Sequence, residues 1–279
     1  MATFATSDQL LVIIDPAARE TDGESVRIAK DVLSAGAAAK VCMPDGPEEF
    51  ARVLARRGAR RPVVIGDDSA LIRAVTLLHR RRELTGCVLS MVPVGGALNV
   101  AHTLGVPAGT VAAARAVLDG VERRMDLLVD DSDGVVLGAL RIPGVTAVAQ
   151  AAEPAAARGW LRPYQHLVRS LSVARPVPAV PRPPARLRVE VDGETVVDLD
   201  QPVENISVTP GGRHGLADVE IRPLSVGAEA TPVRAAGRTV TVTGADFRYR
   251  ADGGVAGPVR RRTWRVVEGA WGLTVPGAP

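Results

Sequence analysis

The chain has 279 residues, of which 46% are hydrophobic, so it can bury a sizeable core in one large domain or two of ordinary size. Its 34 basic and 31 acidic residues leave a formal charge of only +3, and no nucleic-acid reader motif is visible, so we expect no nucleic-acid partner. Nearly every base is arginine, because lysine occurs only at Lys30 and Lys40. A bound phosphate would therefore be held by arginines, backbone amides or a metal ion.

The two cysteines, Cys42 and Cys87, lie in short apolar runs far apart in the sequence, which predicts buried thiols in a reducing compartment. No apolar run approaches the roughly 20 residues that span a bilayer, and the N-terminal stretch lacks the pattern of a cleaved signal. We therefore expect a cytoplasmic protein without a transmembrane segment, whose membrane contact is peripheral, at the inner face.

In the first half of the chain, short apolar runs alternate with segments in which apolar residues recur at the spacing of a helix. This order predicts a parallel sheet covered by helices on both faces, with ligands at the carboxyl ends of the strands. The expected strands are 10–14, 40–43, 62–65 and 87–92, and the expected helices are 24–35, 48–57, 69–80 and a segment from about 98.

Beyond about residue 123 the pattern changes to short alternating runs separated by turn signals such as Asp133-Gly134 and Asp192-Gly193. This change predicts an all-β layer. Residues 160–171 are expected to form one helix there, and the proline-rich stretch 175–186 is expected to be an extended connector.

Three loops of the first half follow predicted strands and carry polar or glycine-rich motifs. They are Ile14-Asp15-Pro16-Ala17-Ala18, Gly66-Asp67-Asp68-Ser69-Ala70, and a stretch from Pro93 to Pro107 that contains Gly95-Gly96 and ends in Leu104-Gly105-Val106-Pro107. Loops of this kind place backbone amides where they can approach an anion.

These motifs resemble those of the bacterial diacylglycerol kinases, a lipid kinase family of the NAD kinase-like superfamily. The first loop is similar to the family's Asn-Pro-x-Ser-Gly turn, and the second to its Gly-Gly-Asp-Gly-Thr loop. The third is the most telling match, since it follows Pro-x-Gly-Thr-Gly-Asn-Asp-Phe-Ala-Arg-x-Leu-Gly-Ile-Pro in spacing and in its ending. Further similarities at 124–127, 216–219 and 247–254 extend the resemblance over nearly the whole chain.

The resemblance implies an α/β plus all-β fold. Its N-terminal Rossmann-like three-layer nucleotide domain would be residues 1–122, and its C-terminal antiparallel β-sandwich domain for the lipid substrate would be residues 123–269. Residues 270–279 would form a terminal strand that returns toward the first domain. The implied reaction is the ATP-dependent phosphorylation of a lipid hydroxyl, with ATP and Mg²⁺ as cofactors.

Phosphoryl transfer needs amides near the phosphates, a Mg²⁺ site and a base for the hydroxyl proton. The resemblance makes Asp68 the candidate metal ligand and a catalytic residue, and leaves Asp252 as the remaining candidate base. The candidate nucleotide-binding residues are Asp15, Gly66, Asp67, Ser69, Arg73, Gly95 and Gly96. Structural roles are the alternative: Asp67 and Asp68 as caps of the following helix, Gly95-Gly96 as a turn and Asp252-Gly253 as a hairpin.

The chain departs from the family at positions that the reaction needs. Asp67 replaces a glycine of the phosphate loop, and its carboxylate would repel a phosphate by about 1 kcal/mol in water. Ala70 replaces the threonine of that loop, and Leu98 replaces the asparagine of the third motif. Gly254 replaces the glutamate on which the resemblance places the catalytic base.

These changes predict a protein with the lipid kinase fold, a pseudo-kinase in which phosphotransfer is weak or lost. The alternatives are a working diacylglycerol or related lipid kinase with a rebuilt site, using Arg73 on phosphate and Asp68 on Mg²⁺, and a non-catalytic protein that binds a lipid or a partner. A lipid at the membrane surface and a second copy of the chain, in a homodimer, are the expected partners. Arg260-Arg261-Arg262 with Trp264 would suit anionic headgroups, or form a solvated strand face.

Overall fold

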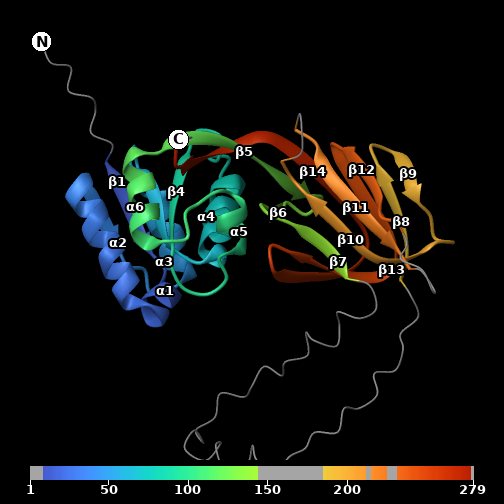
Figure 1. Ribbon diagram of the computed structural model, residues 1–279, viewed down its shortest axis with the longest axis horizontal. Helices are drawn as coiled ribbons and strands as arrows, with labels where there is room; N and C mark the ends of the chain where they lie inside the picture. Colours follow the sequence, from blue (N-terminus) through green and yellow to red (C-terminus); the bar gives the residue numbers. More distant parts are fainter. Residues whose placement is uncertain (1–8, 144–184, 212–214, 225–230, 278–279) are drawn as a thin grey trace, which may run out of the picture.

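The computed structural model describes residues 9–143, 185–211, 215–224 and 231–277 (Figure 1). The helix expected at 160–171 and nearly all of the connector expected at 175–186 lie outside these ranges.

A parallel sheet forms the first part of the chain. Its strands are β1 (Leu10–Ile14), β2 (Ala39–Cys42), β3 (Arg61–Gly66) and β4 (Val88–Pro93), in the order β2-β1-β3-β4. Almost every side chain of β1, β3 and β4 is buried, because helices cover both faces of this sheet. The strands expected from the sequence are confirmed to within one residue at each end.

Helices flank the sheet on two sides. They are α1 (Pro16–Thr21), α2 (Gly23–Gly36), α3 (Pro47–Ala55), α4 (Asp68–Arg80), α5 (Asn99–Thr103) and α6 (Thr110–Asp119). Figure 1 shows α2 and α6 on one side of the strands and α4 and α5 on the other. The helix expected from residue 98 is two helices, because Gly105 adopts a left-handed backbone with φ of 88° and Pro107 follows it. No helix in the described ranges is both long and apolar enough to cross a membrane.

The antiparallel part of the fold begins at β5 (Val121–Asp130). The strands that follow are β6 (Val135–Val136), β7 (Leu140–Pro143), β8 (Ala185–Val191), β9 (Glu194–Val197), β10 (Pro202–Thr209), β11 (Ala217–Pro223), β12 (Val233–Gly237), β13 (Thr239–Ala251) and β14 (Gly254–Val275). Both β10 and β13 pair with β7 along one stretch and with β8 along another. These four strands therefore close on one another around a core that includes Ile206 and Trp264.

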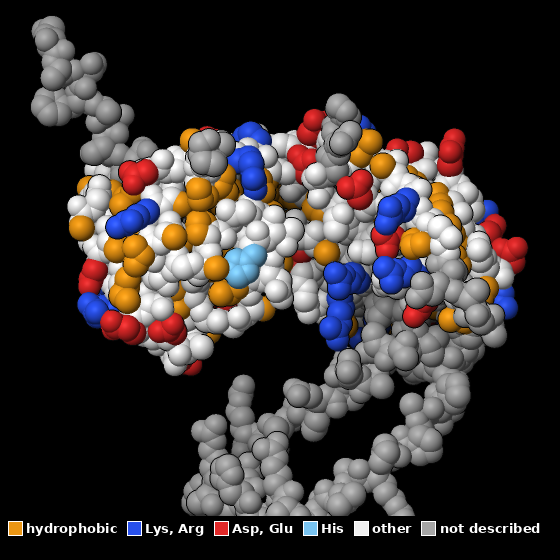
Figure 2. Space-filling model, in the orientation of Figure 1, with side chains coloured by type: hydrophobic (Ala, Val, Ile, Leu, Met, Phe, Trp, Pro, Cys, Tyr) orange, Lys and Arg blue, Asp and Glu red, His pale blue; other side chains and the backbone are white. Residues whose placement is uncertain are grey.

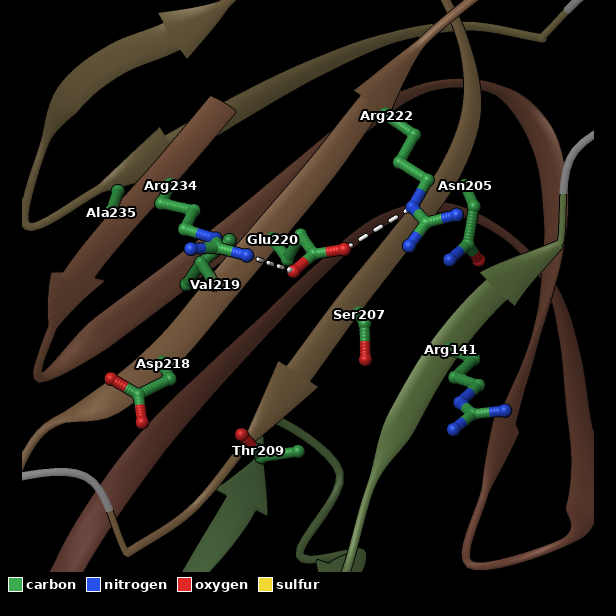
Figure 3. A pocket seen from close by; sticks show the side chains of 10 residues that line it. All are labelled: Arg141, Asn205, Ser207, Thr209, Asp218, Val219, Glu220, Arg222, Arg234 and Ala235. Atoms are coloured by element: carbon green, nitrogen blue, oxygen red, sulfur yellow. Dashed lines mark hydrogen bonds and ion pairs between the residues drawn. The ribbon is translucent and has the colours of Figure 1, made fainter. Parts of the chain in front are cut away.

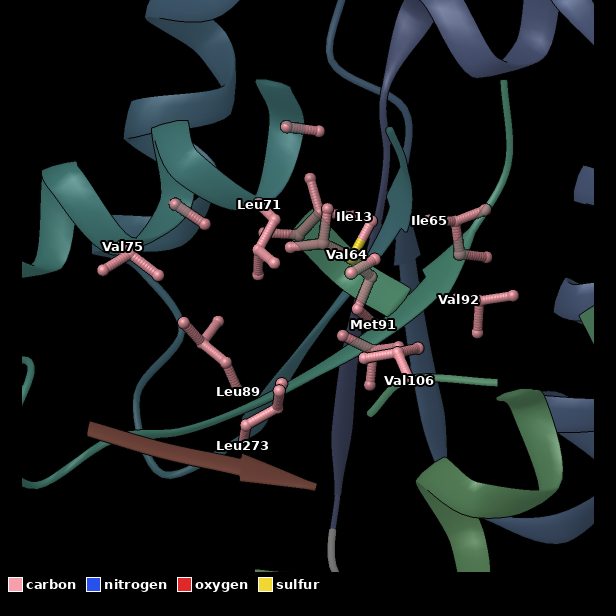
Figure 4. Close-up of a cluster of buried hydrophobic side chains, with 14 of the residues drawn as sticks. Ile13, Val64, Ile65, Leu71, Val75, Leu89, Met91, Val92, Val106 and Leu273 are labelled. Carbon is pink, nitrogen blue, oxygen red and sulfur yellow. The ribbon is translucent and has the colours of Figure 1, made fainter. Parts of the chain in front are cut away.

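Strand β14 joins the two parts. Its first half pairs with β13, whereas Gly272 and Leu273 pair in parallel with Val88 and Leu89 of β4. Figure 4 shows Leu273 beside Leu89 in the core of the parallel sheet. Strand β5 pairs antiparallel with the second half of β14, from Trp264 to Val275. Its side chains enter both cores, Leu128 the antiparallel one and Leu127 the parallel one, so two strands are shared by the two cores.

The burial of the tryptophans and cysteines agrees only in part with what the sequence predicts. Trp264 and Trp271 are fully buried, so Trp264 is a packing residue and is not the exposed aromatic of a basic patch. Both cysteines are free thiols, and Cys87 is buried as expected. Cys42 is partly exposed, because β2 is the edge strand of the parallel sheet.

Candidate functional site

Three loops meet at the carboxyl edge of the parallel sheet. A Cβ atom on Gly66, at the end of β3, would lie 3.0 Å from the Cβ of Asp15, which follows β1. A Cβ on Gly95, after β4, would lie 3.6 Å from the Cα of Ala18. Gly95 also has a φ of 108°, which glycine adopts without strain. The structure thus brings together the three motifs that the sequence singles out.

Asp15 is held by a helix terminus and an arginine. Its side chain is buried and accepts a hydrogen bond of 3.0 Å from the backbone N–H of Ala17, which caps α1. Its second oxygen accepts from the Arg73 guanidinium at 2.7 Å. That guanidinium also lies 5.5 Å from the centroid of the Phe50 ring, in cation–π geometry. Arg73 therefore offsets the charge of Asp15 and makes no ion pair with Asp67 among the described residues.

Asp67 is the N-cap of α4. One carboxylate oxygen accepts from the N–H of Ala70 at 3.2 Å, and the other faces Gly96, where an added Cβ would lie 3.3 Å away. The carboxylate thus stands between the N-terminus of α4 and the glycine loop. The N-terminus of a helix attracts anions, because its first N–H groups are free to donate and the helix dipole is positive there. The Asp67 carboxylate occupies this position at α4, where a phosphate would otherwise bind. Ser69, two residues along, is exposed on the first turn of α4.

Asp68 is buried, with 3% of its surface exposed, and caps a different helix. Its two oxygens accept from the N–H groups of Val100 and Ala101, each at 2.9 Å, at the start of α5. Its own N–H donates to the Ala97 carbonyl at 2.8 Å. Mg²⁺ in proteins keeps several water ligands, which a buried carboxylate bound by two amides does not accommodate. The geometry fits a helix cap better than the Mg²⁺ ligand that the resemblance implies.

Asp252 lies in the tight turn between β13 and β14, with a φ of 49°. Its carboxylate accepts from three successive backbone N–H groups, at 2.6, 2.7 and 3.0 Å, which belong to Leu137, Gly138 and Ala139. Burial raises the pKa of Asp252 above its ordinary value, although the three amides act in the opposite direction. The negative charge of Asp68 adds to the rise in pKa.

Asp68 and Asp252, the two candidate catalytic acids, lie on either side of the contact between Gly138 and Val100. A Cβ on Gly138 would lie 3.2 Å from an oxygen of Asp252 and 3.4 Å from a methyl group of Val100, the residue that Asp68 caps. Sequence reasoning missed the partners of both acids, the amides at 100–101 and 137–139. Backbone amides have no side-chain signature, so no motif could have identified them.

A cavity of about 480 Å³ opens beside this contact, between α5 and the antiparallel strands. It is lined by Leu104, Met125, Leu137 and Thr209 together with Arg123, whose guanidinium donates to the Leu104 carbonyl. The lining also includes Arg124 and the acidic Asp126, so apolar groups and charges of both signs meet in this cavity.

Comparison with known proteins places this arrangement in a known fold. No protein-family model matches the sequence, and no curated protein matches it significantly. Among solved structures, one from Bacillus anthracis str. Sterne with a provisional diacylglycerol kinase assignment is 13% identical, with a TM-score of 0.70 over 97% of this chain and 98% of that chain. A second, described as a diacylglycerol kinase of the same organism, is 11% identical, with a TM-score of 0.68 and the same coverage.

An NAD kinase from Archaeoglobus fulgidus in complex with ATP is also similar. It is 14% identical, with a TM-score of 0.53 over 95% of this chain and 93% of that chain. Identities this low show the fold alone, and the coverage shows that the likeness includes both parts of the molecule. The resemblance noted in the sequence is thus confirmed as a likeness of structure: this chain has the fold of the diacylglycerol kinase and NAD kinase structures.

Proposed function

We propose that this chain is a protein of the lipid kinase fold in which ATP-dependent phosphorylation of a lipid hydroxyl is weak or lost. The observation that carries the proposal is the position of Asp67. Its carboxylate caps α4 and faces Gly96, where the resemblance puts the nucleotide phosphates. A negative charge at that position opposes phosphate binding by about 1 kcal/mol in water and by more near a protein surface.

The two acids that could act as base or metal ligand support the same proposal. A general base needs a free lone pair directed at the substrate hydroxyl. A carboxylate has about four lone-pair sites, of which amides use three in Asp252 and two in Asp68, and these bonds fix the direction in which each buried acid points. Releasing either acid would leave buried donors without acceptors, which costs about 1–3 kcal/mol for each donor.

We further propose the domain organisation that the resemblance implies. It consists of a Rossmann-like nucleotide domain at 1–122, a β-sandwich domain at 123–269 and a terminal strand at 270–279. The parallel order β2-β1-β3-β4 and the return of β14 to β4 support these boundaries. The lipid would lie in the cavity of about 480 Å³ beside Leu104 and Leu137.

The proposal is tested by thermal shift with ATP and Mg²⁺ on wild type and on Asp67→Asn. Asparagine is as good an N-cap as aspartate, so the variant removes the charge and keeps the cap. We expect little or no shift for wild type, and an affinity for ATP about fivefold higher in the variant. Asp45→Asn is the control, because it removes one acidic charge at an exposed loop position, and it should leave ATP binding unchanged. Equal ATP affinity of wild type and Asp67→Asn would contradict the role given to Asp67.

A working lipid kinase is the second candidate, and the raised pKa of Asp252 favours it. Enzymes raise carboxyl pKa values by burial to make them effective acids and bases at neutral pH. Turnover of ATP and diacylglycerol by the wild-type chain separates the two candidates. We expect turnover far below ordinary kinase rates, whereas ordinary rates that Asp252→Asn abolishes would establish the second candidate and refute the first.

A further inference from the structure

The outer face of the antiparallel part carries a hollow of about 630 Å³ over strands β7, β10, β11 and β12. Inward-facing residues of these strands, such as Ile206 and Ile221, belong to the core, so the alternate residues face outward. Figure 3 shows the polar side chains that line the hollow, and Figure 2 shows basic side chains gathered near the lower edge of the antiparallel part.

The strand register places four of these side chains in one row. Arg141 is opposite Ser207, Ser207 is opposite Glu220, and Glu220 is opposite Arg234. Directly opposite residues of neighbouring strands point to the same face, so the row runs across the hollow. Glu220 is shared between Arg234 at 3.5 Å and Arg222 at 3.2 Å, which leaves one carboxylate for two guanidinium groups.

The positive charge at the other end of the row is not compensated. On β13, Arg250 is directly opposite Arg141, and like charges in that position destabilise a sheet. Neither arginine makes an ion pair with any residue that the structure describes. A bound anion would relieve this repulsion, and Ser207 would supply a hydroxyl donor at the centre of the row. Figure 3 shows Ser207 on β10, the strand between those that carry Arg141 and Arg222.

We propose that this hollow binds a phosphate ester, with the phosphate held by Arg141 and Arg222 above the Ser207 hydroxyl. Arginine suits this task because its planar guanidinium donates two parallel hydrogen bonds to a phosphate. At the far end of the hollow lie Asp218 and Thr209, opposite each other in the strand register. Glu220, opposite Ser207, is neutralised by two arginines, whereas Asp218 makes no ion pair within the described residues. The charge of Asp218 therefore disfavours a polyphosphate and favours a ligand whose remaining groups are hydroxyls, such as a glycerol phosphate unit. The site lies outside the three loops and does not depend on the proposed function.

The test uses the full chain and two forms of the same chemistry. Glycerol 3-phosphate is titrated by calorimetry, and sedimentation is measured with phosphatidylcholine vesicles that contain or lack phosphatidic acid. The variants are Arg141→Ala, Arg222→Ala and Ser207→Ala, each checked for folding by circular dichroism. Arg27→Ala is the matched control, because Arg27 lies on α2 away from the hollow, is 58% exposed, pairs with Glu24 and carries the same charge.

We expect Arg141→Ala and Arg222→Ala each to weaken binding about tenfold, Ser207→Ala to weaken it by a few fold, and Arg27→Ala to leave it unchanged. This pattern with glycerol 3-phosphate would support a soluble phosphate ester, and the same pattern with phosphatidic acid vesicles alone would support a lipid headgroup. Absence of binding to both probes, or an equal loss in Arg27→Ala and Arg141→Ala, would overturn the proposal. ATP is omitted throughout, so failure of this test leaves the proposal on Asp67 untouched.

Discussion

At the scale of single residues, the acids at the carboxyl edge of the parallel sheet serve as acceptors for backbone N–H groups. Asp15 caps α1, Asp67 caps α4 and Asp68 caps α5. A buried amide that loses its acceptor destabilises the fold, whereas a hydrogen bond gained on folding contributes only about 1 kcal/mol. These side chains should therefore affect folding stability before they affect any chemistry.

Asp68→Ala gives the clearest test of that role. The N–H groups of Val100 and Ala101 would lose a buried acceptor, so we expect the free energy of unfolding to fall by about 1–3 kcal/mol for each unsatisfied donor. The change is measured by urea denaturation. Ser69→Ala is the control, because the neighbouring Ser69 is exposed and makes no side-chain hydrogen bond within the described residues. Equal stability of the two variants would show that Asp68 does not hold α5.

A second buried acid, Asp130, predicts a loss of stability in acid. Burial acts to raise its pKa, but hydrogen bonds from Gly134 and Ser132 and the nearby Arg262 outweigh burial, so its pKa lies below the ordinary 3.8. A lowered pKa in the folded state stabilises the fold above the pKa of the unfolded chain, and this stabilisation is lost as the pH falls through the folded pKa. The stability difference between wild type and Asp130→Asn should therefore shrink below about pH 4.

Asp252 should show the opposite dependence on pH. Its pKa is raised in the folded state, so its contribution is present below the ordinary 3.8 and is lost as the pH rises through the folded pKa. The two acids are compared by urea denaturation of wild type, Asp130→Asn and Asp252→Asn. The free energy of unfolding is measured at several pH values between about 3 and about 7. Differences from wild type that change with pH in the same direction for both variants would contradict this assignment.

At the scale of elements, the sequence predicts the strands and helices of the first part well. The spacing at which apolar residues recur depends directly on which face of a strand or helix is buried. The strand at 10–14 and the helix at 69–80 are examples, and both are found within one residue. The hydrogen-bond partners of Asp68 and Asp252 could not be predicted in this way. Asp68 contacts amides 32 and 33 residues away and Asp252 contacts amides 113 to 115 residues away, so their roles depend on how elements pack.

The last strand supplies an element-scale prediction. Leu273 is fully buried in the core of the parallel sheet and pairs with Leu89 of β4. Leu273→Ala should lower the free energy of unfolding by about 2–5 kcal/mol, because it removes apolar contacts and leaves a cavity. Val255→Ala on the same strand is the control, since Val255 is 53% exposed and should cost little. Similar urea midpoints for the two variants would mean that the end of β14 adds little to this core.

At the scale of the whole molecule, the two cores are coupled through shared strands. Strand β14 pairs with β13 in one part and with β4 in the other, and β5 pairs with its second half, from Trp264 to Val275. His79 at the end of α4 also contacts Asp133 in the turn after β5, at 2.8 Å. Separating the parts would break continuous strand pairing, so local unfolding of one part should destabilise the other.

The two buried tryptophans allow this coupling to be measured. Trp264 lies in the antiparallel core and Trp271 in the parallel core, only seven positions along the same strand. In Trp160→Phe/Trp271→Phe the fluorescence reports the antiparallel core, and in Trp160→Phe/Trp264→Phe it reports the parallel core. Because β14 passes through both cores, we expect fluorescence and far-UV circular dichroism to give coincident urea transitions within each variant. A fluorescence transition displaced from the dichroism transition in either variant would show that one core unfolds without the other and that the shared strands do not couple them.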